Sequence, residues 1–372
     1  MKQHIAVLGT GMVGRAIVYD LSHEHRITAA DSNPQALRLC REMKGVETRQ
    51  ADLTDTEQIT RIIKEADLVV SAVPGFMGYE TVKTVITKGK PVVDISFMPE
   101  DFMELDALAR EKGVTAIADC GVAPGMPNLI LGHHSQQMNI ERFEYMVGGL
   151  PRERKFPFEY KAPFSPIDVL EEYTRPARVM EHGQVVTREA MSEPEMVHFE
   201  GLGHLEAFNT DGLRSLLQTM DHIPYMKEKT LRYPGHIRLI QALKASGFFA
   251  EQEVDTGSHK VRPLDVTNQV LMKDWKLDAG EREFTIMRIN LEGGGRTITY
   301  DLLDEYDPVT GLSSMARTTG FTATAAASML LEGIFGKKGM FPPEHIGQAE
   351  GCFPYIMEYL ENRGISLRLT QA

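Results

Sequence analysis

Short apolar runs and amphipathic stretches alternate through the first third of the chain. The apolar runs fall at 4–8, 26–30, 46–50, 67–74, 91–96 and 114–121. Apolar positions at helical spacing fill the segments between them, at 12–22, 34–43, 54–64, 79–88 and 100–112. Buried strands that alternate with helices are typical of βαβ units, in which helices cover both faces of a parallel sheet. The pattern predicts a Rossmann-type, doubly wound α/β domain over residues 1–125.

The pattern changes after Pro124-Gly125-Met126-Pro127. One more helix is expected at 128–139, and helices also at 166–172 and 235–246. Longer strands with alternating apolar and polar positions are expected at 142–150, 283–292 and 297–306. Alternation of this kind indicates a mostly antiparallel sheet with one solvated face. Residues 126–319 are therefore predicted to form a second, α+β domain.

The segment 316–361 again has a helical pattern, and its first half is rich in small residues, TTGFTATAAASMLLEGIF. Small side chains allow a helix to approach its neighbour closely, so we expect this helix to be tightly packed. At the other end of the chain, Thr54-x-x-Glu57 has the spacing of a capping box and predicts a helix that begins at Thr54.

A glycine motif directly follows the first predicted strand: Gly9-Thr10-Gly11-Met12-Val13-Gly14. In this motif the first glycine allows a tight turn, the second lets the backbone approach a pyrophosphate, and the third lets helix and strand come close. The strand before it and the helix after it give the motif the context that a dinucleotide site requires.

Asp31 ends the second predicted strand, about twenty residues after the glycines, where the dinucleotide fingerprint places an acid. A carboxylate there accepts hydrogen bonds from the ribose hydroxyls and repels a 2′-phosphate. Since residues 32–36 (SNPQA) contain no cation, we expect NAD as the cofactor, with NADP less favoured.

Ligands of such sheets bind beyond the carboxyl ends of the strands. Besides the glycine motif and Asp31, the residues expected there to contact the cofactor are Ser32, Asp52, Leu53, Ala72, Val73, Pro74, Ser96 and Val122. Asp94 and Asp119 end neighbouring strands and are candidate catalytic bases, because a carboxylate buried beside nicotinamide acquires a raised pKa. A role in capping the following backbone is the alternative for each of them.

Composition narrows the class of protein. Of 372 residues, 40 are basic and 52 acidic, which gives a formal net charge of −12 and no basic field for nucleic acid or an anionic membrane. The three cysteines, Cys40, Cys120 and Cys352, form no CxxC pair, which suits a reducing compartment. With no long apolar span and a strand that starts almost at the first residue, we expect a cytoplasmic protein.

Three segments stand out downstream of the glycine motif: DCGVAPGMPNLI (119–130), LEAFNTDG (205–212) and KTLRYPGH (229–236). They resemble the saccharopine dehydrogenase superfamily, and within it the L-lysine 6-dehydrogenases. Further similarity lies at 160–177, 313–333 and 337–346, so that it covers nearly the whole chain. Asn209 departs from the residue usual in lysine 6-dehydrogenases.

This resemblance implies a Rossmann domain, residues 1–125, that is completed by the C-terminal helices, residues 320–372. It implies that residues 126–319 bind substrate and form a homodimer or higher oligomer. It also implies an NAD-dependent oxidative deamination of L-lysine at the 6-amino group, which yields the semialdehyde and ammonia. The chemistry requires a group for the α-carboxylate and a base for the ammonium, whose ordinary pKa is near 10.4.

Arg232 is the candidate for the carboxylate, because a guanidinium pairs with it in a bidentate fork. His236 would share its face of a helix and add a hydrogen bond or a proton relay. Glu206 is a third catalytic candidate, since an acid there could hold a cationic amine; Asp211 is a weaker one. The remaining substrate-binding candidates are Asn209, Thr210 and Tyr173, with Thr174, Arg175 and Lys161 as further possible pocket residues.

Two alternatives remain open. The enzyme could act on a secondary amine, such as saccharopine or a carboxylated polyamine, with a second cation among Arg175, Arg178 and Arg317. Alternatively, the chain could be a non-catalytic, dimeric NAD sensor. The adjacent His133 and His134 would point to opposite sides of a helix, so no metal site is expected.

Overall fold

The computed structural model describes residues 2–162, 166–278 and 280–372. Residues 163–165, within the similar segment 160–177, lie outside the described residues. The chain divides into two compact units: unit 1 comprises residues 1–139 with 315–366, and unit 2 comprises residues 140–314 with 367–372. The helix that follows residue 125 belongs to unit 1 and the last strand belongs to unit 2. The boundaries expected at residues 125 and 319 would place each of them in the other unit.

Unit 1 is built on a seven-stranded sheet whose neighbouring strands are all parallel, in the order β17-β6-β5-β4-β1-β2-β3. The strands are β1 (His4–Leu8), β2 (Arg26–Asp31), β3 (Val46–Gln50), β4 (Leu68–Ser71), β5 (Val92–Asp94), β6 (Thr115–Ile117) and β17 (Gly339–Phe341). Every residue of β4, β5 and β6 is buried, as the apolar runs predicted. The expected doubly wound parallel sheet is confirmed.

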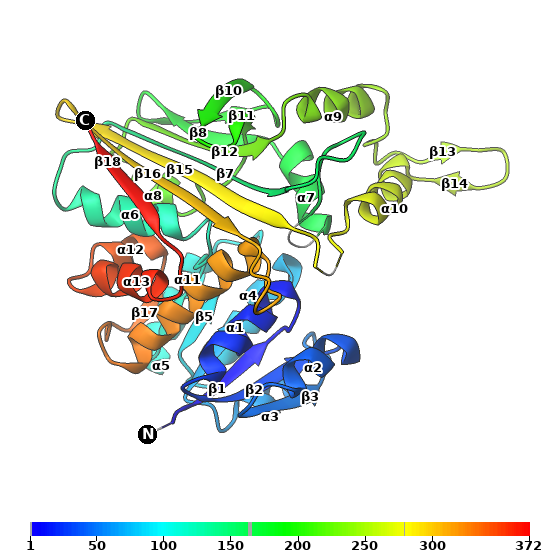
Figure 1. The fold of residues 1–372 in the computed structure, drawn as a ribbon. Helices are drawn as coiled ribbons and strands as arrows, with labels where there is room; N and C mark the ends of the chain where they lie inside the picture. Colours follow the sequence, from blue (N-terminus) through cyan, green and yellow to red (C-terminus); the bar gives the residue numbers. More distant parts are fainter. Residues whose placement is uncertain (1, 163–165, 279) are drawn as a thin grey trace. The chain divides into compact units, whose positions relative to one another are not determined.

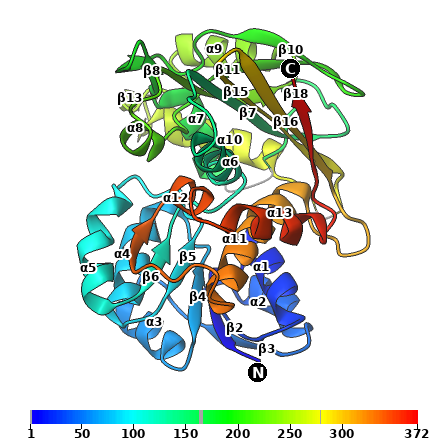
Figure 2. The same cartoon turned by 90° about the vertical axis from the view of Figure 1, so that its left-hand side faces the viewer.

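Helices cover both faces of this sheet (Figure 2). The first helices are α1 (Met12–Ser22), α2 (Pro34–Arg41), α3 (Thr56–Ile63), α4 (Gly75–Thr87), α5 (Asp106–Lys112) and α6 (Met126–Ser135), with a 3-10 turn at Phe102–Leu105. The later ones are α11 (Ser314–Leu331), α12 (Pro343–Gly347) and α13 (Cys352–Glu361). The apolar core of the unit gathers under α3, α4 and α5, and includes Leu8, Val69 and Val92.

The cap of α3 differs from the prediction. The residue before the helix is Asp55, whose carboxylate accepts hydrogen bonds from the backbone N–H groups of Glu57 and Gln58. Thr54 instead donates its hydroxyl to Asp52, at 2.7 Å. A carboxylate one residue further on takes over the capping role, so the helix begins at Thr56 rather than at Thr54.

The small-residue helix α11 lies against α1 (Figure 1). A Cβ at Gly320 would lie 3.2 Å from Cβ of Ala16 and 3.4 Å from the backbone oxygen of Val13. The sequence predicted that this helix is tightly packed but did not identify α1 as the helix against which it packs. It missed β17, because a three-residue strand shows no periodicity.

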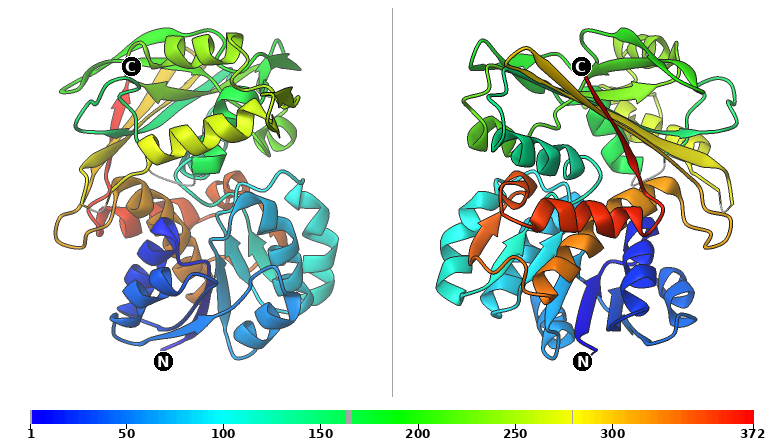
Figure 3. Two further views of the ribbon diagram at one scale, coloured as in Figure 1. Left: turned by 90° about the vertical axis from the view of Figure 1, so that its right-hand side faces the viewer. Right: turned by 60° about the vertical axis from the view of Figure 1, so that its left-hand side comes forward.

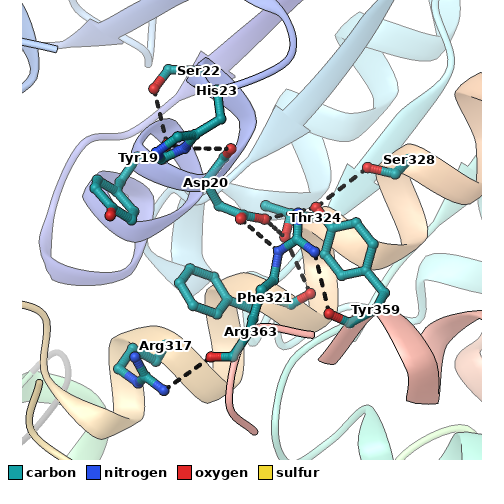
Figure 4. Close-up of polar contacts among 10 residues, drawn as sticks. All are labelled: Tyr19, Asp20, Ser22, His23, Arg317, Phe321, Thr324, Ser328, Tyr359 and Arg363. Carbon is teal, nitrogen blue, oxygen red and sulfur yellow. Dashed lines mark hydrogen bonds and ion pairs between the residues drawn. The ribbon is translucent and has the colours of Figure 1, made fainter. Parts of the chain in front are cut away.

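A buried ion-pair cluster fastens α1 to the C-terminal helices (Figure 4). The Asp20 carboxylate accepts hydrogen bonds from Thr324 Oγ1 (2.5 Å), Tyr359 OH (2.7 Å) and Arg363 Nε (2.6 Å). The Arg363 guanidinium also lies over the Tyr359 ring, 3.3 Å from its centroid. These contacts fix the helix that carries the glycine turn at its N-terminus.

Unit 2 contains a mixed, mostly antiparallel sheet of nine strands with the main order β10-β11-β12-β7-β15-β16-β18. Its strands are β7 (Arg142–Pro151), β8 (Ala177–Glu181), β9 (Gln184–Arg188), β10 (Glu195–Phe199), β11 (Gly203–Asn209), β12 (Tyr225–Arg232), β15 (Glu283–Gly293), β16 (Arg296–Glu305) and β18 (Leu367–Gln371). Only the pair β12–β7 is parallel among the described ladders of this sheet. The mostly antiparallel second sheet is thereby confirmed, and Figure 3 shows β18 beside β16.

The helices of unit 2 are α7 (Pro166–Thr174), α8 (Leu216–Thr219), α9 (His236–Ala245) and α10 (Pro263–Trp275). The hairpin of β13 (Val254–Asp255) and β14 (Lys260–Val261) lies between α9 and α10 in the sequence and projects from the unit (Figure 1). Residues of α7, α9 and α10 form one apolar core with the sheet, including Tyr173, Ile240 and Trp275. Among the described residues, no helix is long and apolar enough to cross a membrane.

Candidate functional site

The glycine turn between β1 and α1 has the geometry of a phosphate-binding loop. Gly9 has a φ of +91°, and a Cβ there would lie 2.4 Å from the backbone oxygen of Ala72. A Cβ at Gly14 would lie 2.0 Å from the backbone oxygen of Gly9. A Cβ at Gly11, in contrast, would meet no described atom within 4 Å. The protein's own packing requires the outer two glycines, while Gly11 leaves room for a ligand.

The start of α1 suits an anion. Gly11 is the N-cap residue, no side chain caps the helix among the described residues, and its first turn carries no acid. Met12 and Val13 contribute the first backbone N–H groups, which carry the positive end of the helix dipole. This arrangement fits a dinucleotide pyrophosphate.

Asp31 ends β2 beside this turn, but its carboxylate is engaged by the protein. One oxygen accepts hydrogen bonds from Thr10, from N at 2.7 Å and from Oγ1 at 3.1 Å, and the other from the backbone N of Asn33 at 2.8 Å. The next residue, Ser32, is exposed, and its carbonyl accepts a hydrogen bond from Gln50. In this structure Asp31 therefore acts as an anchor for the glycine turn.

The next candidate cofactor-binding residues along the carboxyl edge of the sheet mostly make contacts within the protein itself. Exposed Asp52 accepts two hydrogen bonds from Thr54, which lower the pKa of its carboxyl group. Leu53 and Val73 are buried in the core, and Ala72 N donates to the backbone oxygen of Leu8 at 2.8 Å. Pro74 is the N-cap residue of α4.

Asp94, at the end of β5, is completely buried. One of its oxygens accepts hydrogen bonds from Ser96, from N at 3.0 Å and Oγ at 2.7 Å, while the other has no partner among the described residues. Burial raises the pKa of the Asp94 carboxyl group to about 7, and the negative charge of Asp119 adds to the shift. Asp94 thus meets the requirement for a group that gains or loses a proton near neutral pH.

Asp119, also buried, begins a tight turn with a left-handed φ of 54°. Cys120 and Val122 in this turn are buried as well, and burial raises the pKa of the Cys120 thiol to about 12, so the thiol stays protonated. A Cβ at Gly125 would lie 1.9 Å from the backbone oxygen of Gly121. The segment 119–125 is therefore a closely folded loop at the carboxyl edge of β6, next to Asp94.

Three substrate candidates of unit 2, Arg232, His236 and Tyr173, form a cluster. Arg232 is the last residue of β12 and His236 the first of α9, so the expectation that they share one helix face is wrong. The Arg232 side chain is 2% exposed, and all three guanidinium nitrogens donate to the protein. Nε donates to Tyr173 OH and Nη1 to the backbone oxygen of Leu231, each at 2.9 Å. Nη2 pairs with the carboxylate of Glu172 and lies 3.4 Å from Tyr160 OH.

The hydrogen bonds around Tyr173 and His236 fix where their protons lie. His236 Nδ1 lies 2.8 Å from the backbone oxygen of Phe158, which only accepts, so Nδ1 carries the proton. His236 Nε2 then accepts the hydroxyl proton of Tyr173 over 2.9 Å, and that hydroxyl accepts from Arg232. Burial lowers the pKa of His236 to about 3, in agreement with a neutral ring. The result is a directed chain from Arg232 through Tyr173 to His236.

Aromatic rings surround this chain. The Arg232 guanidinium lies 4.3 Å from the centroid of the Tyr160 ring, a cation–π contact. Trp275, the single tryptophan of the sequence, is fully buried with its ring centroid 5.2 Å from that of Tyr160 and 5.9 Å from that of His236. Burial also raises the pKa of both tyrosines, Tyr160 and Tyr173, so both stay protonated.

The remaining acidic and polar candidates lie apart from one another, Glu206 and Asn209 in strand β11 and Thr210 and Asp211 just after it. Glu206 is opposite Arg232 in the β11–β12 ladder and accepts a hydrogen bond from Gly235 N at 3.1 Å. Asn209 is buried and donates its amide to Ser192, and Thr210 shares a hydrogen bond of 2.9 Å with Thr230. Asp211 pairs with Arg178 through both oxygens. Only Glu206 neighbours the Arg232 cluster directly.

The further candidates Lys161, Arg175 and His133 contact other residues of the protein. Lys161 donates to the backbone oxygens of Asp274 and Lys276, and Arg175 pairs with Glu171. His133 stacks on Phe353 at 4.0 Å. The described residues contain no group of three or more metal-ligating side chains.

Three residues of unit 2 were missed by the sequence reasoning. Glu172 and Tyr160 lie in segment 160–177. Its resemblance to the saccharopine dehydrogenase superfamily is the one feature of the sequence that points to them. Glu228 is buried in β12 with one oxygen that has no partner among the described residues, and burial raises the pKa of its carboxyl group to about 8. No sequence pattern distinguishes this glutamate from a surface one in an alternating strand.

Comparison with known proteins decides the family. Residues 5–117 match the family model described as the saccharopine dehydrogenase NADP binding domain, and residues 121–365 match that of the saccharopine dehydrogenase C-terminal domain. The chain belongs to the saccharopine dehydrogenase family. The resemblance of the three motifs to this superfamily is thereby confirmed.

Curated members of the saccharopine dehydrogenase family align over almost the entire chain. Saccharopine dehydrogenase [NADP(+), L-glutamate-forming] of Schizosaccharomyces pombe is 24% identical, with 98% of each chain covered. Mitochondrial alpha-aminoadipic semialdehyde synthase of Bos taurus is 22% identical over 98% of this chain but 47% of its own length. The chain thus spans about half the length of the mammalian relatives that it matches.

A solved structure of the same family has the same fold. Saccharopine dehydrogenase (L-Glu forming) of Saccharomyces cerevisiae superposes with a TM-score of 0.81 and 20% identity, over 100% of both chains. At this identity the likeness shows the fold and leaves the substrate to other evidence.

The expectation of NAD as cofactor is wrong. The model that matches residues 5–117 is an NADP binding domain, and the relatives from both yeasts are named as NADP(+) enzymes. The error came from treating Asp31 as a free acceptor for the ribose. Its carboxylate instead holds Thr10 and Asn33, so its position after β2 does not report on the 2′-phosphate.

Proposed function

We propose that this chain is an NADP-dependent saccharopine dehydrogenase, which oxidises the secondary amine of saccharopine to an imine that water hydrolyses to L-glutamate and an aldehyde. The observation that carries the proposal is the match of consecutive saccharopine dehydrogenase domains over residues 5–117 and 121–365. The names of the yeast relatives supply the cofactor and the product. We propose this reaction in place of the oxidation of free L-lysine that the resemblance implied.

Unit 1 would hold the cofactor. The dinucleotide phosphates would approach the backbone at Gly11, where the structure leaves space, and the N-terminus of α1 would stabilise their charge. Bound NADP supplies the acceptor for a hydride. The 2′-phosphate would be held by neutral donors, and the hydroxyl of exposed Ser32 is a candidate for one of them.

Oxidation of an amine also requires that a proton leave the nitrogen. Asp94, with a pKa of about 7, is our first candidate to hold that proton, and Asp119 is the neighbouring acid. In unit 2, Arg232 is our candidate for a substrate carboxylate, oriented by Tyr173 and His236. Glu206 remains a proposed contact for a cationic amine, and Asn209 and Thr210 remain proposed substrate-binding residues.

A substrate screen tests this function. Purified protein is mixed with saccharopine, L-lysine or a carboxylated polyamine, each with NADP⁺ or NAD⁺, and reduced nicotinamide is followed by absorbance. We expect turnover of saccharopine with NADP⁺, with glutamate as a product. Lysine oxidation with ammonia release would replace this proposal with a lysine 6-dehydrogenase. Cofactor binding without turnover of any amine would indicate a non-catalytic protein.

We also propose that the protein is a homodimer, with residues 126–319 as the dimer-forming region. Light scattering coupled to gel filtration measures the mass in solution. A monomeric mass at micromolar concentration would contradict this part of the proposal.

A further inference from the structure

Arg232 already has a carboxylate partner, Glu172, and the two side chains differ in exposure. The Arg232 side chain is 2% exposed, whereas that of Glu172 is 24% exposed. Glu172 therefore forms the solvent-facing side of the ion pair. A ligand that approaches Arg232 from solvent meets Glu172 first.

The other groups that accept hydrogen bonds from Arg232 carry no charge. They are the hydroxyls of Tyr173 and Tyr160 and the backbone oxygen of Leu231. A buried guanidinium without an anion is strongly unfavourable, because its desolvation is not offset by a charge partner. Arg232 therefore requires a carboxylate at Nη2, which either the protein or a ligand must supply.

The arginine itself is held in place. Nε and Nη1 are fixed by Tyr173 and by the backbone oxygen of Leu231, and Tyr173 is fixed in turn by His236. A planar guanidinium with a fixed orientation presents Nη2 in one direction. Arg232 is therefore the fixed partner of the pair, and Glu172 is the more exposed one.

We infer that Glu172 occupies the position of a substrate carboxylate on Arg232, and that an amino-acid ligand binds by displacing it. This inference rests on the proposed function, in which the substrate is an amino acid. It makes Glu172 a specificity-determining residue. A ligand with a carboxylate replaces the charge that it displaces, whereas an amine without one would leave Arg232 buried and unpaired.

Trp275 provides a readout that does not depend on turnover. It is the single tryptophan of the sequence, fully buried, with its ring centroid 5.2 Å from that of Tyr160 and 6.1 Å from that of Tyr173. Its fluorescence therefore reports on the surroundings of this ring, which include the cluster around Arg232.

The test compares Glu172→Gln with the matched control Glu171→Gln, which alters the neighbouring acid that pairs with Arg175. Each protein is titrated with L-glutamate, with L-lysine and with 1,5-diaminopentane, which lacks the carboxylate, while Trp275 emission is recorded. We expect the Kd for both amino acids to fall at least tenfold in Glu172→Gln and to stay at the wild-type value in Glu171→Gln. No protein should respond to 1,5-diaminopentane.

Unchanged or weaker amino-acid binding in a folded Glu172→Gln protein would overturn the inference, and so would an equal response to 1,5-diaminopentane. If Glu172→Gln does not fold, Glu172→Asp, whose carboxylate is drawn back by one methylene, is expected to tighten binding in the same direction. Saccharopine turnover with unaltered affinity in the variant refutes this inference alone. Tighter amino-acid binding in the variant without oxidation of any amine refutes the proposed function alone.

Discussion

At Gly11 the backbone has a φ of −60°, which any residue adopts, and an added Cβ would meet no described atom within 4 Å. A larger side chain there fills ligand space only. We therefore expect Gly11→Val, a change at the N-cap of α1, to lower the free energy of unfolding by no more than about 1 kcal/mol. The KM for NADP⁺ should rise by about tenfold or more, because the pyrophosphate loses its close approach to the backbone.

Urea unfolding and initial rates at varied NADP⁺ measure the two effects. The control is Gly14→Ala, whose Cβ would lie 2.0 Å from the backbone oxygen of Gly9. It should lower stability by about 1–3 kcal/mol. Gly11→Val with an unaltered KM would remove this turn from the cofactor site.

The sequence singled out residues by their position in a motif but did not determine their contacts. Asp31 stands where the fingerprint places an acid, yet its carboxylate is bound by Thr10 and Asn33. Arg232 was chosen to bind a carboxylate, and the structure shows one on it, from Glu172. A side-chain partner supplied by a distant segment has no signature in the local pattern.

Among the secondary-structure elements, α1 depends most on distant partners. Asp20 in α1 is 7% exposed and receives hydrogen bonds from α11, from α13 and from Arg363 just after α13. We expect Asp20→Asn to destabilise unit 1 by about 2–4 kcal/mol, because it removes the anion that neutralises Arg363 in a largely buried pair.

Thermal and urea unfolding measure this change, with Glu24→Gln as the control for removal of an exposed acid near the same helix. Equal stability of the two variants would show that the cluster does not fasten α1.

Element prediction succeeded throughout the alternating strands and helices of residues 1–125 and at the three longest strands of unit 2, but it missed the other strands of unit 2. The strands β7, β15 and β16 each span ten or eleven residues, and all three were expected within one or two residues of their bounds. The short strands β13, β14 and β17 were not expected, and neither were β8, β9, β10, β11, β12 and β18, which span five to eight residues. In these strands the partner strand, rather than the local sequence, sets the conformation.

On the scale of the whole molecule, buried acids make stability depend on pH. Glu228 is 5% exposed in unit 2, and burial raises the pKa of its carboxyl group to about 8 in the folded state. An unfolded glutamate titrates near 4.3. Between these values the folded state binds one more proton than the unfolded state, so its stability falls as the pH rises from about 4 to about 8.

Glu228→Gln should remove this part of the decline and stabilise unit 2 at pH 8 by an amount on the order of a few kcal/mol. Urea unfolding at several pH values measures it. Glu292→Gln, which alters an exposed acid paired with Arg142, is the control. A pH dependence identical in all three proteins would show that Glu228 ionises in the folded state as it does in water.

The division of the chain into two units was harder to predict than either unit. The chain passes between the units after residues 139, 314 and 366. The sequence indicated a change in the pattern of apolar and polar positions near residue 125. It did not indicate which helix packs against the small-residue helix α11. Which segments fold together is set by long-range contacts such as that of Gly320 with Ala16.

The wide separation of Asp20 from its partners has a consequence for synthesis. Thr324, Tyr359 and Arg363 follow it by 304, 339 and 343 residues. At translation rates of about 5–20 residues per second, Arg363 is made roughly 17–70 s after Asp20. For that interval the nascent glycine turn leads into a helix whose Asp20 is still hydrated and whose Ala16 lacks its contact with Gly320. Unit 1 therefore completes its fold only after unit 2 has been almost entirely synthesised.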